Sequence, residues 1–200
     1  MAKEINKINT KKLKRIEPKD IIQDDNPIIR KISFDIPFPL SKEDKTTMNQ
    51  MVDYVRSSQD KDETKKRSLR SAYGISAVQI GKPKKMLFVR IENKFGGEAE
   101  EFALVNPKII KSSTKKSFLD SGEGCLSVPR EYDGYVLRSS SVIINAIDYF
   151  SEREVEIEAN GLTSIVLQHE MDHLMGILFY DRINKLNPWA MNDKTAIKIK

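Results

Sequence analysis

Residues 161–176 read Gly-Leu-Thr-Ser-Ile-Val-Leu-Gln-His-Glu-Met-Asp-His-Leu-Met-Gly, and they are the most informative stretch of the chain. Their apolar residues recur at helical spacing and share one stripe with both histidines of the protein: Leu162, Ile165, Val166, His169 and His173. The spacing predicts a helix from about residue 161 to residue 175, ended by Gly176. Because the stripe is apolar, both histidines are expected to point into the protein.

The run His169-Glu170-Met171-Asp172-His173 has the His-Glu-x-x-His pattern of metal-dependent hydrolases. Residues four apart lie on the same face of a helix, so the two histidines can bind one ion together. The pattern also places the Glu170 carboxylate beside the ion, where it can take a proton from a bound water molecule. A metal site with a catalytic carboxylate is therefore the first hypothesis about function.

The third metal ligand is the open question. A zinc peptidase with this pattern takes it from a Glu, His or Asp further along the chain. No Glu or His follows His173, and the aspartates that do are Asp181, which is close in sequence, and Asp193. Cys125 is the best remaining candidate, because it is the only cysteine and Gly124 before it lets the backbone bend close to a ligand. Three protein ligands would leave a fourth position open, which is typical of a catalytic metal.

The composition is that of a soluble globular protein, with 39% hydrophobic and 32% charged residues among 200. This length suffices for one domain with its own core. The longest apolar runs are too short to span a bilayer, and the charged N-terminus lacks the apolar segment of a secretory signal, so no membrane partner is expected. A single cysteine cannot form an internal disulfide, which fits a reducing compartment such as the cytoplasm.

The charge distribution sets the first residues apart from the rest. The net charge of +5 is too mild for a dedicated nucleic-acid-binding protein, so no specific nucleic acid partner is expected. Much of the excess lies at the N-terminus, where six Lys or Arg residues stand against Glu4. Residues 1–15 are predicted to be a flexible basic tail, and residues 16–200 the folded domain. The tail is either simply solvated or a weak tether to something anionic, such as a ribosome.

The rest of the chain alternates between helical and strand-like patterns. Residues 41–44, Ser-Lys-Glu-Asp, resemble a capping box, and the apolar spacing after them predicts an amphipathic helix over about 42–58. The nearly wholly polar residues 59–70 are interpreted as an exposed loop or a frayed helix end. Strands are expected at 86–89, 102–105, 136–149, 153–158 and 195–199. The second of these strands should end at Asn106-Pro107, and the whole order indicates an α+β fold in a single domain.

Three segments make the chain resemble the peptide deformylase family. Residues 123–127 and 169–173 match the Glu-Gly-Cys-Leu-Ser and His-Glu-x-x-His motifs of the family in full. Residues 72–79, Ala-Tyr-Gly-Ile-Ser-Ala-Val-Gln, are similar to its Gly-x-Gly-x-Ala-Ala-x-Gln motif, with Ala72 in place of the first Gly and Ser76 in place of the first Ala. The resemblance covers about residues 15–200 and is to the longer, type 2 form of the family.

The resemblance implies an α+β fold in which antiparallel sheets pack around a central metal-binding helix, all within a single domain. It implies a metal-dependent hydrolase that removes the formyl group from the N-terminal formylmethionine of newly synthesised polypeptides and releases formate. The implied partners are N-formylmethionyl nascent peptides, with a transient association with the ribosome. The implied cofactor is one divalent metal ion, Fe(II) as the native ion, with Zn, Ni or Co as replacements.

The resemblance also implies the chemical roles within the site. The metal ligands would be Cys125, His169 and His173. Glu170 would accept the proton of the attacking water molecule and deliver it to the leaving amine. The Gln79 side-chain amide and the Leu126 backbone N–H would stabilise the negative charge on the former formyl oxygen.

A further set of residues would bind the substrate and support the ligands. Tyr73 and Gly74 would contact the substrate, with Gly74 letting its backbone approach as an added strand. An apolar pocket for the methionine side chain would be lined by three residues of the late helix: Leu162, Ile165 and Val166. Asp172, by its place in the family motif, should meet an arginine near the site, and Arg138 is the candidate.

Besides an RNA-binding module, which only the basic tail supports, two other functions stay open from the sequence. One is a zinc metallopeptidase of the His-Glu-x-x-His type, which would need a third ligand after His173. The other is a non-catalytic protein that binds formylated N-termini or keeps a structural metal. A chain without a glutamate at position 170 would favour the non-catalytic protein. Because Glu170 is present, the sequence favours an enzyme over this alternative.

Overall fold

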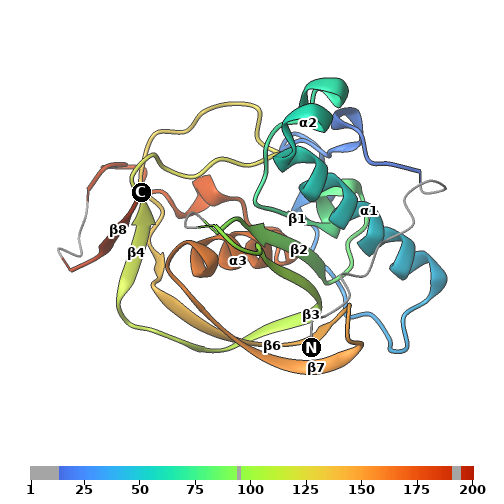
Figure 1. The fold of residues 1–200 in the computed structure, drawn as a ribbon. Coiled ribbons are helices and arrows are strands. Elements are labelled where there is room, and N and C mark those ends of the chain that lie inside the picture. The colour runs from blue at the N-terminus through green and yellow to red at the C-terminus, as the bar shows by residue number, and fades with distance from the viewer. Residues whose placement is uncertain (1–13, 94–95, 191–194) are drawn as a thin grey trace.

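Two β-sheets contact the helix that carries both histidines, and a second long helix lies on the other side of the larger sheet (Figure 1). The computed structural model describes residues 14–93, 96–190 and 195–200. The α-helices described are α1 (Lys42–Gln59), α2 (Lys61–Arg67) and α3 (Gly161–Leu174). The strands described are β1 (Gly74–Ser76), β2 (Met86–Ile91), β3 (Glu100–Ser112), β4 (Lys116–Leu119), β5 (Arg138–Ser139), β6 (Ser141–Asp148), β7 (Arg153–Asn160) and β8 (Ile197–Ile199). The short 3-10 helices described are η2 (Pro18–Asp20), η3 (Pro27–Arg30), η4 (Ala77–Ile80) and η5 (Phe179–Arg182).

The larger sheet is antiparallel throughout, with the strand order β1-β2-β3-β6-β7. The smaller sheet has the order β5-β4-β8, and its β4–β8 pair is parallel. Helix α3 contacts strands of both sheets, and Figure 1 shows it in the middle of the molecule. The predicted α+β fold, a single domain of largely antiparallel sheets around a central helix, is confirmed.

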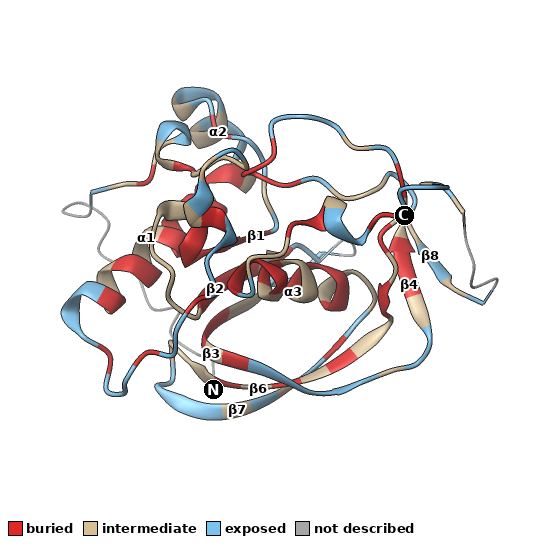
Figure 2. Cartoon of the chain, turned by 180° about the vertical axis from the view of Figure 1, so that it is seen from behind, coloured by how far each residue is buried: buried red, intermediate tan, exposed pale blue. Residues whose placement is uncertain are grey.

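Strand β2 shows why helices α1 and α3 lie on opposite faces of the larger sheet. Met86 and Phe88 belong to the core cluster that contains the apolar residues of α1. Leu87 and Val89 belong to the cluster that contains Val166 of α3. Successive side chains of a strand point to opposite faces, so a strand covered on both faces is apolar at every position. Figure 2 shows the result, with buried residues in α1, α3 and the central strands.

Helix α1 begins where the sequence predicted. The Ser41 side chain accepts a hydrogen bond from the Asp44 backbone N–H at 3.1 Å and so satisfies a free amide of the first turn. The apolar residues of the predicted stripe are fully buried: Met48, Met51, Val52 and Val55. The helix therefore packs through its amphipathic face against β1 and β2.

The polar stretch after α1 forms helix α2, so the expectation of a loop or frayed end over residues 59–70 was wrong. The Asp60 side chain accepts hydrogen bonds from the backbone N–H groups of Asp62 at 3.0 Å and Glu63 at 2.9 Å. Acidic residues occupy the first turn of α2 and basic residues its last turn, as the helix dipole favours. An exposed helix has no apolar periodicity to reveal it, and the capping aspartate was the signal that sequence reasoning missed.

Strand β3 continues through Asn106-Pro107, where the sequence predicted its end. The backbone of Asn106 has a φ of 51°, and the pairing of β3 with β6 shifts register between Val105 and Lys108. The Asn106 side chain accepts from the Ile36 backbone N–H at 2.9 Å and donates to the Ile36 carbonyl at 2.8 Å. This irregularity, held by a segment 70 positions away, lets the strand continue past a proline.

The predicted strand over residues 136–149 is divided between the two sheets. Strand β5 pairs with β4 in the smaller sheet, whereas β6 pairs with β3 and β7 in the larger one. Ser140 lies between them, with its N–H donating to the Lys115 carbonyl and its own carbonyl accepting from the Gly161 N–H. The division places Arg138 in the smaller sheet, which contacts α3. The strands predicted at 153–158 and 195–199 are present as β7 and β8.

Helix α3 ends at the glycine that the sequence predicted. Gly176 has a φ of 71°, and its N–H donates to the His173 carbonyl at 3.1 Å. The Ile177 N–H donates to the Asp172 carbonyl at 2.9 Å, which completes a Schellman motif. A Cβ atom at Gly176 would overlap the carbonyl oxygen of Arg30. The end of α3 is therefore fixed both by its own backbone and by the segment packed against it.

Most of the predicted basic tail, residues 1–13, lies outside the described residues, so its flexibility stays a prediction. Arg15, in the part that is described, forms an ion pair with Glu63 of α2 at 3.1 Å. Within residues 14–93, 96–190 and 195–200, none of the helices has both the length and the hydrophobicity that crossing a membrane requires.

Gly176→Ala is expected to destabilise the protein more than Gly81→Ala. Both glycines have a positive φ, 71° and 76°, so the substitutions share the same backbone strain, about 1 kcal/mol. Only Gly176 meets backbone atoms at the Cβ position, whereas the nearest atom at Gly81 is 3.8 Å away. The clash should cost about 1–3 kcal/mol more in the free energy of unfolding, measured by urea denaturation. Equal losses in the two variants would contradict this account.

Candidate metal centre and active site

Three potential metal ligands converge from two distant parts of the chain. Cys125 lies in the loop after β4, and His169 and His173 lie on α3. One donor atom of each residue lies within 4.8 Å of the donors of the other two. The Cys125 Sγ is 3.2 Å from the Nε2 of His173, and both side chains are buried. A thiol and two imidazoles at this separation fit a single divalent cation such as Zn(II) or Fe(II).

The two histidines have different electrostatic surroundings. Burial would lower the pKa of His169, but its contacts with Cys125 and Glu123 raise the pKa well above the usual value. That ring therefore lies where positive charge is stabilised. Burial and the nearby charges of His169 and Arg138 lower the pKa of His173 well below its usual value. His173 is thus held in the neutral form that a metal ion requires.

Glu123 orients the His169 ring through the Nδ1 nitrogen. Its Oε2 is 2.8 Å from the Nδ1 of His169, which leaves the other ring nitrogen for the site. Burial alone would raise the pKa of Glu123, but hydrogen bonds from Arg138 and His169 hold it at about 2. Glu123 stands two residues before Cys125 in the same motif, yet sequence reasoning gave it no role. Its position in the motif, next to the proposed ligand, was the available signal.

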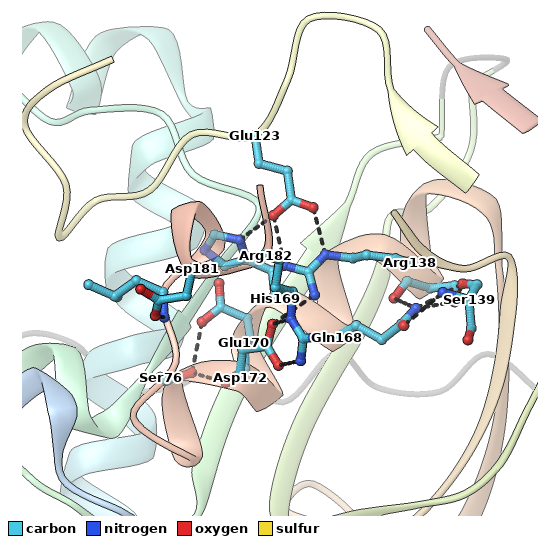
Figure 3. A network of polar contacts seen from close by, with 12 residues as sticks. Ser76, Glu123, Arg138, Ser139, Gln168, His169, Glu170, Asp172, Asp181 and Arg182 are labelled. Atoms are coloured by element: carbon cyan, nitrogen blue, oxygen red, sulfur yellow. Dashed lines mark hydrogen bonds and ion pairs between the residues drawn. The ribbon is translucent and has the colours of Figure 1, made fainter. Parts of the chain in front are cut away.

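The predicted contact between Arg138 and Asp172 is present, within a larger network (Figure 3). The Nη1 of Arg138 donates to Asp172 at 2.9 Å, while its Nε and Nη2 donate to Glu123 at 2.6 and 2.8 Å. Arg182 forms an ion pair with the same aspartate from the more exposed side. Residues of alternating charge contact one another in series: Arg182, Asp172, Arg138, Glu123 and His169. Helix α3 is therefore held by ionic contacts as well as by apolar packing.

Glu170 lies beside the cluster of ligands and is buried. Burial raises the pKa of its carboxyl group, and a carboxylate with a raised pKa can accept a proton more readily. The Ser76 hydroxyl is 2.8 Å from its Oε2 and 2.9 Å from its backbone carbonyl oxygen. A Cβ atom at Gly74 would lie 2.8 Å from both the Cγ and the Oε1 of Glu170. Gly74, predicted to make room for a substrate, therefore also makes room for this glutamate.

Gln79 turns its amide nitrogen toward the ligands. Its Oε1 accepts a hydrogen bond from the Ser76 backbone N–H at 2.8 Å, which assigns the orientation of the amide. Its Nε2 is then 3.2 Å from the Ser127 hydroxyl and 3.6 Å from the Cys125 Sγ. A buried donor beside a metal centre can stabilise negative charge that develops during a reaction.

A cavity of about 310 Å³ opens onto this cluster. Its lining contains most of the residues that the sequence singled out: Tyr73, Gly74, Gln79, Cys125, Leu126, Ile165, Val166, His169 and Glu170. Tyr73 is half exposed, and so it lies where the cavity meets solvent. Leu162 does not line the cavity, so its predicted place in the pocket was wrong. It lies in the first turn of α3 and packs against the core cluster of the larger sheet.

Comparisons with known proteins agree with this geometry. The family model described as polypeptide deformylase matches residues 18–189. The chain belongs to the polypeptide deformylase family. It is 45% identical to peptide deformylase 2 of Bacillus cereus over 175 residues, which is 88% of this chain and 94% of that protein. It is 41% identical to the peptide deformylase of Malacoplasma penetrans, over 86% of this chain and 91% of the relative.

Solved structures show the same deformylase fold. Arabidopsis thaliana peptide deformylase 1B, in complex with an inhibitor, superposes with a TM-score of 0.66 and 32% identity, over 86% of this chain and 83% of the other. A class I type b peptide deformylase from Acinetobacter baumannii, with Met-Ala-Ser bound, superposes with a TM-score of 0.64 and 27% identity. The match covers 82% of this chain and 96% of the other. This deformylase is therefore a hydrolase, and its reaction removes the N-terminal formyl group of new polypeptides.

The alternatives from the sequence are not favoured for this deformylase. A zinc peptidase would need a third ligand after His173, and Asp181 instead forms an ion pair with Arg30. Asp193, the other aspartate considered, lies outside the described residues. A non-catalytic binder is not favoured either, because the family is enzymatic and Glu170 lies in the cavity.

Cys125→Ala and His173→Ala are each expected to lose the bound metal ion. Each removes one of three clustered donors, and a site with two protein ligands binds a cation far more weakly. The measurement is the metal content of purified protein by elemental analysis. Glu170→Gln is the matched control, because it changes a neighbouring buried residue that is not a ligand and should keep its metal. Stoichiometric metal in either ligand variant would contradict the assignment.

Proposed function

We propose that this deformylase acts on N-formylmethionyl peptides with one divalent cation held by Cys125, His169 and His173. The observation that carries the proposal is the convergence of these donors, two of which, Cys125 and His169, line one cavity together with Glu170. A divalent cation bound there would polarise the formyl carbonyl and lower the pKa of a water molecule toward 7. We infer Fe(II) as the native ion from the resemblance to the family, with Zn, Ni or Co as replacements, because one thiolate and two imidazoles suit Fe(II) and Zn(II) alike.

Glu170 is the proposed acid–base residue. Its carboxylate lines the cavity and is buried, and burial raises its pKa. A carboxylate with a raised pKa can accept the proton of the attacking water molecule and then donate it to the leaving amine. The same group thus serves both halves of the hydrolysis.

Gln79 and Leu126 are the proposed stabilisers of the tetrahedral intermediate. The Gln79 amide nitrogen is oriented by the Ser76 backbone, so it needs no rearrangement when charge develops on the formyl oxygen. Leu126 directly follows Cys125 and lines the same cavity, which supports its backbone N–H as the second donor to that oxygen. Loss of one such donor typically raises the barrier by about 2.7–4 kcal/mol.

The substrate is proposed to lie along β1. This strand is the edge of the larger sheet, so its free side can pair with an extended peptide. Ile165 and Val166 offer apolar surface for a methionine side chain, with Tyr73 at the mouth of the cavity. The relative from Acinetobacter baumannii has Met-Ala-Ser bound, which has the sequence of a deformylated N-terminus.

We infer that the enzyme works in the cytoplasm, where formylated chains emerge from ribosomes. Its substrates there would be nascent N-formylmethionyl peptides. A transient association with the ribosome, through the basic residues of the N-terminus, is part of the proposal.

Metal-loaded enzyme is expected to release formate from formyl-Met-Ala-Ser and to leave acetyl-Met-Ala-Ser intact. Glu170→Gln should lower kcat by about 10³-fold or more while the metal is retained, because the water molecule and leaving amine lose their proton carrier. Formate release is followed by a coupled dehydrogenase assay. Near-normal turnover in Glu170→Gln would overturn the proposed mechanism, and cleavage at an internal peptide bond would overturn the proposed reaction.

Gly74→Ala is expected to lower kcat by about 100-fold with little change in metal content. The added methyl group would lie 2.8 Å from the Glu170 side chain and push the carboxylate from its place. Steady-state kinetics with formyl-Met-Ala-Ser and elemental analysis provide the two measurements. A variant with unchanged kcat would show that Glu170 tolerates displacement.

A further inference from the structure

Ser76 is a buried serine at the end of β1, where the deformylase motif quoted above has an alanine. Its side chain is fully buried, and its hydroxyl lies 2.8 Å from the Oε2 of Glu170 and 2.9 Å from the Glu170 carbonyl oxygen. Figure 3 shows the serine directly beside the glutamate. A buried hydroxyl placed against a buried carboxylate forms a charge-assisted hydrogen bond, which is among the stronger ones in proteins.

The two oxygens of the Glu170 carboxylate are not equivalent. Oε2 accepts a hydrogen bond from the Ser76 hydroxyl, whose single proton it shares with the Glu170 carbonyl oxygen. Oε1 lies on the side of Gly74, 2.8 Å from the position that a Cβ atom of residue 74 would take. Within the described part of the chain, Oε1 accepts no hydrogen bond. Gly74 and Glu170 both line the cavity. One oxygen is thus held by the protein, and the other is left for the reacting water molecule.

We propose that Ser76 is a positioning residue whose hydroxyl holds Oε2 of Glu170 and so presents Oε1 as the atom that exchanges the proton. The inference rests on the proposed role of Glu170. The terminal torsion of a glutamate is broad, so a carboxylate without a partner samples many orientations. The hydroxyl narrows that range, and a reaction that needs one orientation becomes faster without tighter binding of the substrate.

The same serine also touches the second proposed reacting group, through its backbone. Its N–H donates to the Oε1 of Gln79 at 2.8 Å. This backbone bond would survive replacement of the side chain, so Ser76→Ala removes the hydroxyl contacts with Glu170 and the capping contact of the hydroxyl with the Gln79 backbone N–H. Alanine is also the residue of the family motif at this position, and it fills nearly the same volume. The variant is therefore expected to fold and to keep its metal.

The first test is the steady-state kinetics of metal-loaded Ser76→Ala on formyl-Met-Ala-Ser. The expected result is a kcat lower by about tenfold, with KM within about twofold of the wild type and full metal content. Ser117→Ala is the matched control, because Ser117 is equally buried and its hydroxyl has no partner among the described residues. It should keep the wild-type kcat. An unchanged kcat in Ser76→Ala overturns the proposal, as does a loss that follows metal loss or a raised KM.

A second variant, Ser76→Thr, restores the hydroxyl. The backbone of Ser76, with a φ of −109° and a ψ of 150°, is extended and accepts threonine. A folded, metal-loaded Thr variant should recover kcat to within about threefold of the wild type, and one as slow as the Ala variant overturns the proposal. If the Thr variant does not fold, Ser76→Ala alone decides. A Glu170→Gln variant that keeps its activity would refute the proposed function. If Glu170→Gln is inactive and Ser76→Ala has the wild-type kcat, only the proposed role of Ser76 is refuted.

Discussion

The buried ion pair between Glu123 and Arg138 is the interaction on which the site depends. Arg138 donates to both oxygens of Glu123, which also accepts from His169. Cys125 follows Glu123 by two residues, so this pair holds the loop with the thiol against the helix with the imidazoles. Burying two charges costs solvation energy, and here several hydrogen bonds offset it. Removal of Arg138 would leave Glu123 with His169 alone, and removal of Glu123 would leave Arg138 with Asp172 alone. Either change would weaken the hold of the loop on α3.

The position of α3 between the two sheets explains why this network can be so specific. Its apolar side packs on the larger sheet through Val166 and Leu167. Its polar residues meet the smaller sheet, where Gln168 contacts Ser139 and Asp172 contacts Arg138. Packing on one side and hydrogen bonds on the other fix the rotation of the helix about its axis. That rotation decides which side chains face the cavity, and it places Leu162, partly buried, against the core cluster of the larger sheet.

The short segment from β1 into η4 links the two groups proposed to act on the substrate. The Ser76 hydroxyl meets Glu170, its backbone N–H meets Gln79, and Gly74 leaves space for the glutamate. These contacts need a rigid backbone, which pairing of β1 with β2 provides. One edge strand thereby orients both groups, and it is also the strand with which we propose that an extended peptide pairs.

The sequence by itself determined the features whose signals lie within a few residues: the helix that ends at Gly176, the spacing of its histidines, the cap at Ser41 and the buried run of β2. The cap of α2 at Asp60 was equally local and was missed only because no apolar pattern accompanied it. Tertiary structure alone decided that Cys125 Sγ lies 3.2 Å from His173 across 48 positions, and that Asn106 bonds Ile36 across 70. Periodicity and capping depend on neighbours within a turn or two, whereas such pairs depend on how the whole chain packs.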